Sequence, residues 1–119
     1  MKIAVASAGE TLESKVEPRF GRASRFILID SDNEGFEVID NTKNLNSLQG
    51  AGIQSAQAVS RLGVDVVITG HCGPKAFRAL QAAGIKVVLA GDCSVGEAVE
   101  RFKRGEIEPA KSADVEGHW

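Results

Sequence analysis

The sequence has no long apolar run. None approaches the roughly 18 consecutive apolar residues of a membrane-spanning helix. Met1-Lys2 leads directly into a strand-like segment and not into a signal peptide. We therefore expect a cytoplasmic protein with no membrane partner. In that reducing compartment, Cys72 and Cys93 are expected to be thiols and not a disulfide.

The chain also has no concentration of basic charge. Its 14 Lys and Arg residues are scattered and are outnumbered by 16 Asp and Glu, for a net charge of −2. A nucleic-acid-binding module needs a clustered cationic face, so this class is excluded. Phosphate-loop and dinucleotide-binding glycine motifs are absent, and no group of carboxylates follows the strands as a two-metal nuclease would require. A hydrolase is therefore disfavoured.

Hydrophobic patterning predicts five strands. Short apolar runs ended by glycine or polar turn residues cover residues 2–6, 25–30, 36–40, 64–69 and 85–90. The second and third runs are five residues apart, and Gly35 ends the connection, which favours an antiparallel hairpin. The segments 11–22 and 41–49 are polar and predict loops.

Apolar residues at helical spacing predict three helices, over residues 53–62, 74–83 and 95–102, which are closed by Gly63, Gly84 and Gly105. Pro74 suits the first position of a helix. Ser94 and Glu97 form a capping box. The order β-β-β-α-β-α-β-α predicts one α/β domain over residues 1–105, with parallel strands wherever helices connect them. Residues 106–119 show no periodicity and are expected to form a mobile tail.

Ligands of open parallel sheets bind beyond the carboxyl ends of the strands. Two cysteine-bearing segments, Gly70–Pro74 and Gly91–Cys93, follow two of the predicted strands directly. If those strands are neighbours, Cys72 and Cys93 occupy adjacent loops, each just before a helix whose N-terminus would lower the thiol pKa. Thiolates are soft ligands for copper, zinc and iron–sulfur species. The alternative is that both are buried structural thiols, which is common for cysteine.

Two further features have both a functional and a structural interpretation. His71 would be an auxiliary ligand beside Cys72 or a solvated loop residue, whereas His118 is a bystander. Arg19, Arg22 and Arg25 would clamp an anion through their guanidinium groups. Alternatively, these charges solvate the loop while Phe20 fills the core beneath it.

Five segments occur in the order and spacing of a known domain: residues 2–6, 19–23, 64–70, 73–76 and 83–87. On these segments the chain resembles the dinitrogenase iron–molybdenum cofactor biosynthesis family, which includes NifX, NafY and the C-terminal part of NifB. The resemblance covers residues 1–105. Stand-alone members of the family include orange-protein-type carriers of a molybdenum–copper sulfide cluster.

The resemblance implies a ribonuclease H-like α/β fold. Its five-stranded mixed sheet has the order 3-2-1-4-5, with strand 2 antiparallel and helices on both faces. By position, it implies that the cofactor is bound by Arg19, Phe20, Gly21 and Arg22 together with Gly70, His71, Gly73 and Pro74. The candidate metal ligands Cys72, Cys93 and His71 come from residue chemistry instead.

The function expected from the resemblance is non-catalytic binding, storage or delivery of a metal–sulfur cluster of the molybdenum, iron–molybdenum or molybdenum–copper type. Its partners would be cluster-donor or cluster-acceptor proteins, including an ATPase of the same gene cluster. The alternative is a cofactor-free regulatory or assembly partner that acts through protein–protein contacts.

Overall fold

The computed structural model describes residues 1–32, 35–45 and 50–113. Five strands are present: β1 (Lys2–Ser7), β2 (Arg25–Asp30), β3 (Phe36–Asp40), β4 (Val66–Thr69) and β5 (Lys86–Leu89). The helices are α1 (Ala51–Arg61), α2 (Pro74–Ala82) and α3 (Val95–Lys103). Every predicted strand and helix is confirmed, with ends shifted by at most two residues. The parts of the expected loop and tail at 46–49 and 114–119, His118 included, lie outside the described residues.

Two short 3-10 turns were not predicted. They are η1 (Phe20–Arg22) and η2 (Thr42–Asn44), and each lies within a segment that the sequence indicated as a loop. Such single turns leave no hydrophobic periodicity to detect, because they are too short to present a repeating face.

The strands form one sheet of order β3-β2-β1-β4-β5. β2 is antiparallel to both of its neighbours, whereas β1, β4 and β5 are parallel to one another. This confirms the strand order and the antiparallel second strand. The ribonuclease H-like description is tested by none of these observations and stays a prediction.

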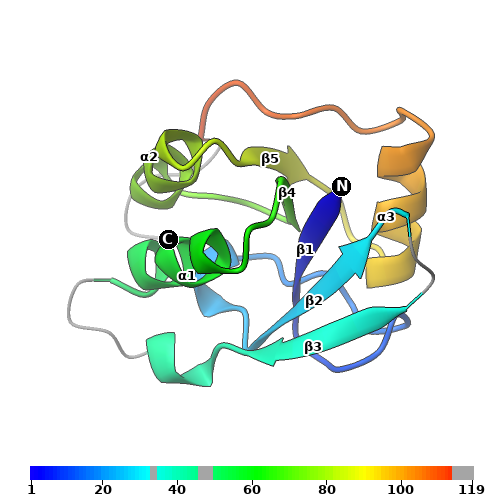
Figure 1. Cartoon of the computed structure of the whole chain (residues 1–119), viewed down its shortest axis with the longest axis horizontal. Helices are drawn as coiled ribbons and strands as arrows, with labels where there is room; N and C mark the ends of the chain where they lie inside the picture. The colour runs from blue at the N-terminus through cyan, green and yellow to red at the C-terminus, as the bar shows by residue number, and fades with distance from the viewer. Residues whose placement is uncertain (33–34, 46–49, 114–119) are drawn as a thin grey trace.

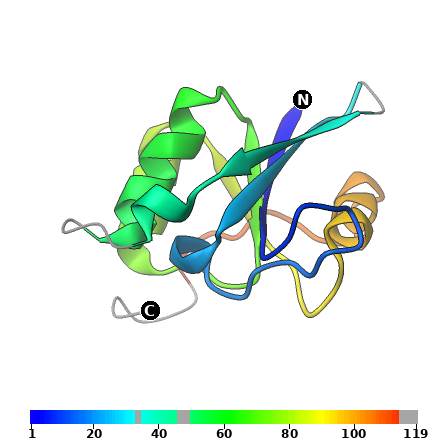
Figure 2. The ribbon, with the colours of Figure 1, turned by 90° about the horizontal axis from the view of Figure 1, so that it is seen from below.

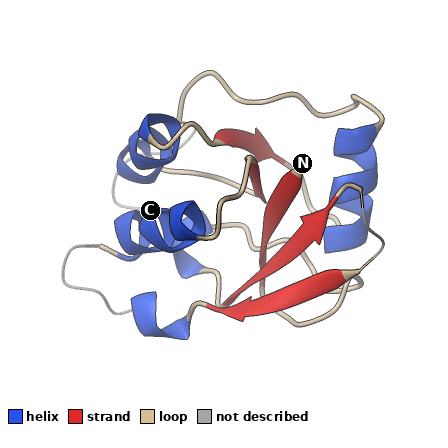
Figure 3. Ribbon diagram, in the orientation of Figure 1, coloured by secondary structure: helices blue, strands red, loops and turns tan. Residues whose placement is uncertain are grey.

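Helices cover both faces of the sheet (Figures 1 and 3). α1 and α2 lie side by side on one face and α3 lies on the other, as the view from below also shows (Figure 2). Alternate residues of each strand point to opposite faces. In β1, Ala4 and Ala6 therefore join the core beneath α1 and α2, whereas Ile3 and Val5 join the core beneath α3. We call these the α1/α2 core and the α3 core.

Residues 106–113 pack along β5. The Ala110 N–H donates to the Val87 carbonyl at 2.7 Å, and Pro109 forms an antiparallel bridge with Val88. Ile107 packs on the α3 core and Ala110 on the α1/α2 core. Residues 106–113 were expected to belong to a mobile tail, and the structure instead packs them against the sheet. The segment covers part of the open edge of β5, where backbone groups would otherwise lack partners.

No helix within the described ranges is both long enough and apolar enough to cross a membrane.

Candidate functional site

The structure brings the two predicted halves of the site together at the carboxyl end of β4. The Phe20 N–H donates to the His71 carbonyl at 3.1 Å, and Arg19 forms a parallel backbone bridge with His71. The Gly70 N–H donates to the Glu17 carbonyl at 3.1 Å. The segments 19–22 and 70–74, more than 45 residues apart in sequence, therefore form one surface, which we call the β4 rim.

Gly70 permits this contact because it has no side chain. A Cβ placed there would lie 2.7 Å from the Pro18 Cα and 2.9 Å from the Pro18 carbonyl oxygen. Both are backbone atoms, which cannot rotate away as the end of a side chain can. Gly70 is therefore needed for the arginine-bearing loop to rest on the end of β4.

A second close approach joins η1 to the first turns of α1 and α2. A Cβ on Gly21 would meet the Gly52 backbone nitrogen at 2.8 Å, and a Cβ on Gly52 would meet the Ala76 Cβ at 3.3 Å. Gly52 belongs to the first turn of α1 and Ala76 to the first turn of α2. The N-termini of both helices therefore lie beside the arginine loop. The role of Gly52 was not predicted, because the sequence around a glycine in a helix does not indicate which other element packs against it.

Both of these helices begin on a glycine. Gly50 is the N-cap of α1, and Gly73 is the N-cap of α2, with Pro74 at the first helical position. A glycine N-cap supplies no side-chain acceptor to the first N–H groups of the helix. Such helix ends carry partial positive charge and bind anions well. The prediction that Pro74 begins a helix at this rim is confirmed.

The three arginines separate into two groups. Arg19 and Arg22 are exposed at the β4 rim. Arg25 instead lies in β2 and is engaged by the carboxylates of Glu10, at 3.2 Å, and Asp40, at 3.7 Å. Two guanidinium groups are therefore placed to meet an anion at the rim, and the third stabilises the sheet beside it.

Phe20 is 2% exposed, and its ring lies 5.5 Å from that of Phe26 in the α1/α2 core. The structural interpretation of this loop is therefore right for Phe20, while the arginines on either side remain at the surface. Phe20 anchors the loop, and its buried ring is not placed to touch a ligand at the rim.

Glu17 is the carboxylate next to the arginine loop. Partial burial raises the pKa of its carboxyl, and this effect outweighs the lowering by the Arg19 backbone N–H and the Arg19 charge. Its backbone joins two strands: the N–H donates to the Ala6 carbonyl at 2.8 Å, and the carbonyl accepts from Gly70.

The structure separates the two cysteines. Cys72 is 1% exposed in the α1/α2 core, and Cys93 is 2% exposed in the α3 core. Their loops follow neighbouring parallel strands, as expected, but their side chains lie on opposite faces of the sheet. The two thiols are therefore buried apart, as the interpretation of both as buried structural cysteines describes. The reason is that each loop turns its cysteine into the core of the helix that follows it.

The expectation of a lowered thiol pKa is wrong for Cys93. Burial raises the pKa of this thiol, with Glu97 and Asp92 adding to the effect and Arg101 opposing it. Among the described residues, no group of three or more His, Cys, Asp or Glu side chains is placed to hold a metal ion. Ligation by Cys72, Cys93 or His71 stays a prediction. His71 is half-buried, and its backbone carbonyl accepts from Phe20.

The arrangement suits an anion better than a bare metal cation, because it offers guanidinium groups and helix N-termini and no set of ligating side chains. Comparison with known proteins identifies the family. The model of the family described as dinitrogenase iron-molybdenum cofactor matches residues 1–105.

Solved structures are similar over nearly the whole chain. The apo form of the orange protein from Desulfovibrio gigas is 42% identical, with a TM-score of 0.92, over 96% of each chain. A candidate NifB protein from Thermotoga is 33% identical, with a TM-score of 0.83, over 96% of this chain and 97% of that one. A relative found by sequence comparison, an uncharacterized protein of Methanocaldococcus jannaschii, is 32% identical over 98 residues, which are 80% of this chain and 82% of the relative.

Proposed function

The chain belongs to the dinitrogenase iron–molybdenum cofactor family, and we propose that it binds, stores or delivers a metal–sulfur cluster without catalysing a reaction. The observation that carries the proposal is the convergence of exposed Arg19 and Arg22 with two glycine-capped helix N-termini at the β4 rim. Guanidinium groups and helix dipoles together favour a multiply charged anion.

The cluster we propose is an anionic sulfide of the molybdenum–copper or iron–molybdenum type. The 42% identity to an orange protein whose structure is that of an apo form supports the first type, and the family supports the second. A thiomolybdate core carries its negative charge on sulfur atoms at its surface, where N–H donors and guanidinium groups can reach it.

The cluster is held chiefly by charge and N–H donors. Arg19 and Arg22 neutralise the negative charge of the cluster, while the N-termini of α1 and α2 offer it their first N–H groups. Gly21 and Gly70 let these elements approach one another, as do Gly52 and Ala76. Cys72 lies under the rim, 1% exposed, and would have to turn outward before its sulfur could ligate a metal.

Delivery requires partner proteins. A cytoplasmic cluster donor or acceptor, including an ATPase of the same gene cluster, fits a carrier whose cargo lies at an accessible rim. An anion held by charge exchanges without the breaking of protein–metal bonds, which suits transfer.

The test is anaerobic titration of the reduced protein with tetrathiomolybdate and Cu(I), followed by visible absorption and by metal analysis after desalting. We expect a charge-transfer band and retained metal for the wild-type protein. Arg19→Gln together with Arg22→Gln should raise the dissociation constant of the cluster at least about tenfold, which corresponds to about 1.4 kcal/mol of binding free energy. Arg78→Gln, an exposed arginine of α2 away from its first turn, is the matched control and should retain metal normally.

Cysteine variants separate the two modes of binding. If charge holds the cluster, Cys72→Ala shifts the band little and Cys93→Ala leaves it unchanged, since Cys93 lies in the α3 core. Loss of the band in Cys72→Ala with normal retention in the arginine variant would reverse our assignment of the binding mode. Absence of any retained metal in the folded wild-type protein would refute the carrier function.

A further inference from the structure

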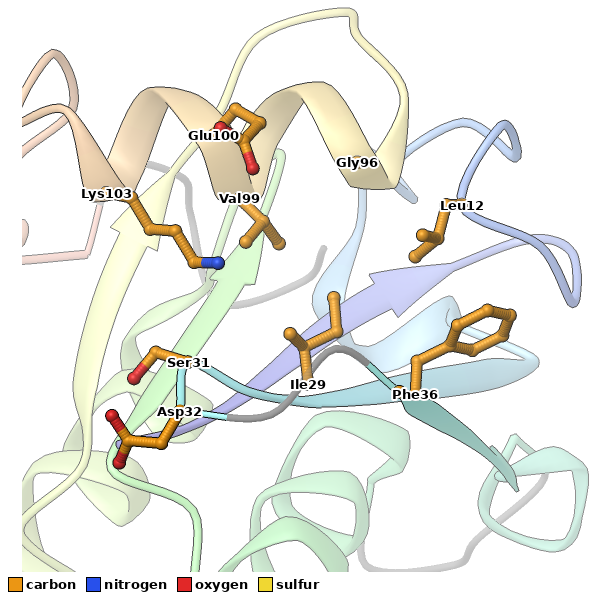
Figure 4. A pocket seen from close by; sticks show the side chains of 10 residues that line it. Leu12, Ile29, Ser31, Asp32, Phe36, Gly96, Val99, Glu100 and Lys103 are labelled. Carbon is orange, nitrogen blue, oxygen red and sulfur yellow. The ribbon is translucent and has the colours of Figure 1, made fainter.

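A groove lies on the face of the sheet that α3 covers, away from the β4 rim. It has a volume of about 290 Å³ and runs between α3 and the β2–β3 hairpin (Figure 4). Its apolar part is formed by Leu12, Ile29, Phe36 and Val99. At its other end, Lys103 of α3 extends toward Ser31 and Asp32 of the hairpin, and Glu100 also lines the groove.

The described ranges leave two large hydrophobic side chains exposed, one that lines the groove and one whose backbone lies beside it. They are Met1, 51% exposed, and Phe36, 45% exposed. Phe36 lines the groove, and the Met1 carbonyl accepts the Ser31 N–H at 2.9 Å, which places Met1 beside the rim of the groove. Exposed apolar side chains that cluster around a concave surface are typical of a protein–protein interface.

The charges at the groove are incompletely paired. Lys103 and Glu100 lie on the same side of α3, and neither forms an ion pair with any residue in the described ranges. Asp32 is engaged by the N-terminal ammonium at 3.5 Å. One surface therefore presents an ammonium group and a carboxylate group that have no ion-pair partner among residues 1–32, 35–45 and 50–113.

We propose that this groove is the contact surface between two copies of the chain, related by a two-fold axis, with Phe36 of each copy seated in the groove of the other. A two-fold interface brings the same patch of both copies together, so the patch must complement itself. This one does, because an apolar projection stands beside an apolar hollow and a cation stands beside an anion. Lys103 of one copy then pairs with Glu100 of the other.

Two features of the molecule favour this contact. β3 is the terminal strand of the sheet, so no described strand lies beyond Phe36 to obstruct a second copy. The net charge of −2 gives little repulsion between copies. The patch is small compared with a stable interface, so we expect weak, concentration-dependent association. The β4 rim stays open in the dimer, since its helices cover the opposite face.

The test is sedimentation of the full chain without cargo over a range from about 10 μM to about 1 mM, which spans the affinities of weak interfaces. We expect the average mass to rise towards that of a dimer. Phe36→Asp should raise the dissociation constant at least about tenfold, as for a central aromatic anchor. Phe36→Leu keeps an apolar projection and should keep most of the association.

A charge exchange tests the geometry. Lys103→Glu and Glu100→Lys should each weaken association, because each places like charges across the axis, and the two together should restore it. Arg78→Glu on α2 is the control for net charge and should leave the mass unchanged. A cooperative thermal unfolding transition, measured at a protein concentration where the chain is monomeric, checks that each variant is folded. A wild-type protein that stays monomeric at the highest concentration overturns the proposal, because the groove then binds a different partner or none. A dimer that persists in Phe36→Asp also overturns it, because that dimer uses another surface.

Discussion

Two helix N-termini that follow neighbouring parallel strands differ in how they are completed. At α3, the Ser94 side chain accepts the Glu97 N–H, and the N–H groups of Val95 and Gly96 donate to the carbonyls of Ser14 and Leu12. The chain itself thus fills this helix end. At α2, Gly73 is the N-cap and supplies no side chain. The α3 end is thus completed by the fold itself, whereas the α2 end has no side-chain cap, which is why our proposal places the cluster there.

The largest expected effect comes from filling the close approach at the β4 rim. Gly70→Ala places a Cβ 2.7 Å from the Pro18 backbone, so the arginine loop must move. We expect a loss of about 2 kcal/mol or more in the free energy of unfolding, and weaker cluster binding as well. Chemical denaturation measures the loss. Gly91→Ala, two residues after the end of β5, has nothing within 4 Å of the added Cβ and should be nearly neutral. Equal effects of the two variants would contradict this account.

Removal of the α3 cap should cost less. Ser94→Ala leaves the Glu97 N–H without its side-chain acceptor at 3.2 Å. The expected loss is about 1 kcal/mol in the free energy of unfolding, with no change in cluster binding. Ser60→Ala, on the exposed side of α1, is the matched control and should not destabilise. A change in cluster affinity in Ser94→Ala would show that the two helix ends are not independent.

The pH dependence should distinguish Glu17 from Asp40. Burial raises the pKa of Glu17, so the native state holds its proton to a higher pH than the unfolded chain does. Its effect on stability is therefore most favourable below the unfolded pKa and is lost as pH rises through the folded pKa. Because this carboxyl is partly exposed, we expect only about a few tenths of a kcal/mol.

Glu17→Gln should remove that loss, which appears in the difference between the wild-type and variant unfolding free energies plotted against pH. Asp40 has the opposite sign, because the hydroxyl and N–H of Thr42 lower its pKa. Asp40→Asn should therefore remove a stabilisation that the wild-type protein loses as pH falls. The same sign for both variants would show that these causes are misassigned.

The smallest expected change in stability comes from giving α2 the kind of cap that α3 has. Gly73 has φ −75° and ψ 168°, which a serine adopts readily. Gly73→Ser should stabilise by about a few tenths of a kcal/mol and compete with the cluster for the first N–H groups of the helix. We therefore expect a small rise in the melting temperature together with weaker retention of tetrathiomolybdate. Unchanged retention of tetrathiomolybdate would contradict the proposal that the N-terminus of α2 takes part in cluster binding.

The sequence predicted the elements well because their signals are local. The apolar stripe of α3, its capping box and the Gly63 and Gly84 positions with φ of +72° and +78° are properties of a few adjacent residues. The two segments of the β4 rim were expected together from the family resemblance, which matched residues 19–22 and 70–74 by position, and the structure brings these segments into contact. Gly52 was missed because its role depends on η1, which approaches from 30 residues away in sequence.

The cysteines show most clearly what only the tertiary structure decided. The sequence by itself determined that Cys72 and Cys93 each follow a buried parallel strand and precede a helix. It could not determine the face of the sheet to which each side chain turns, because that depends on which helix packs over each loop. The fold places α2 and α3 on opposite faces, so one thiol enters each core, and the residues left at the rim are arginines and glycine-capped helix ends.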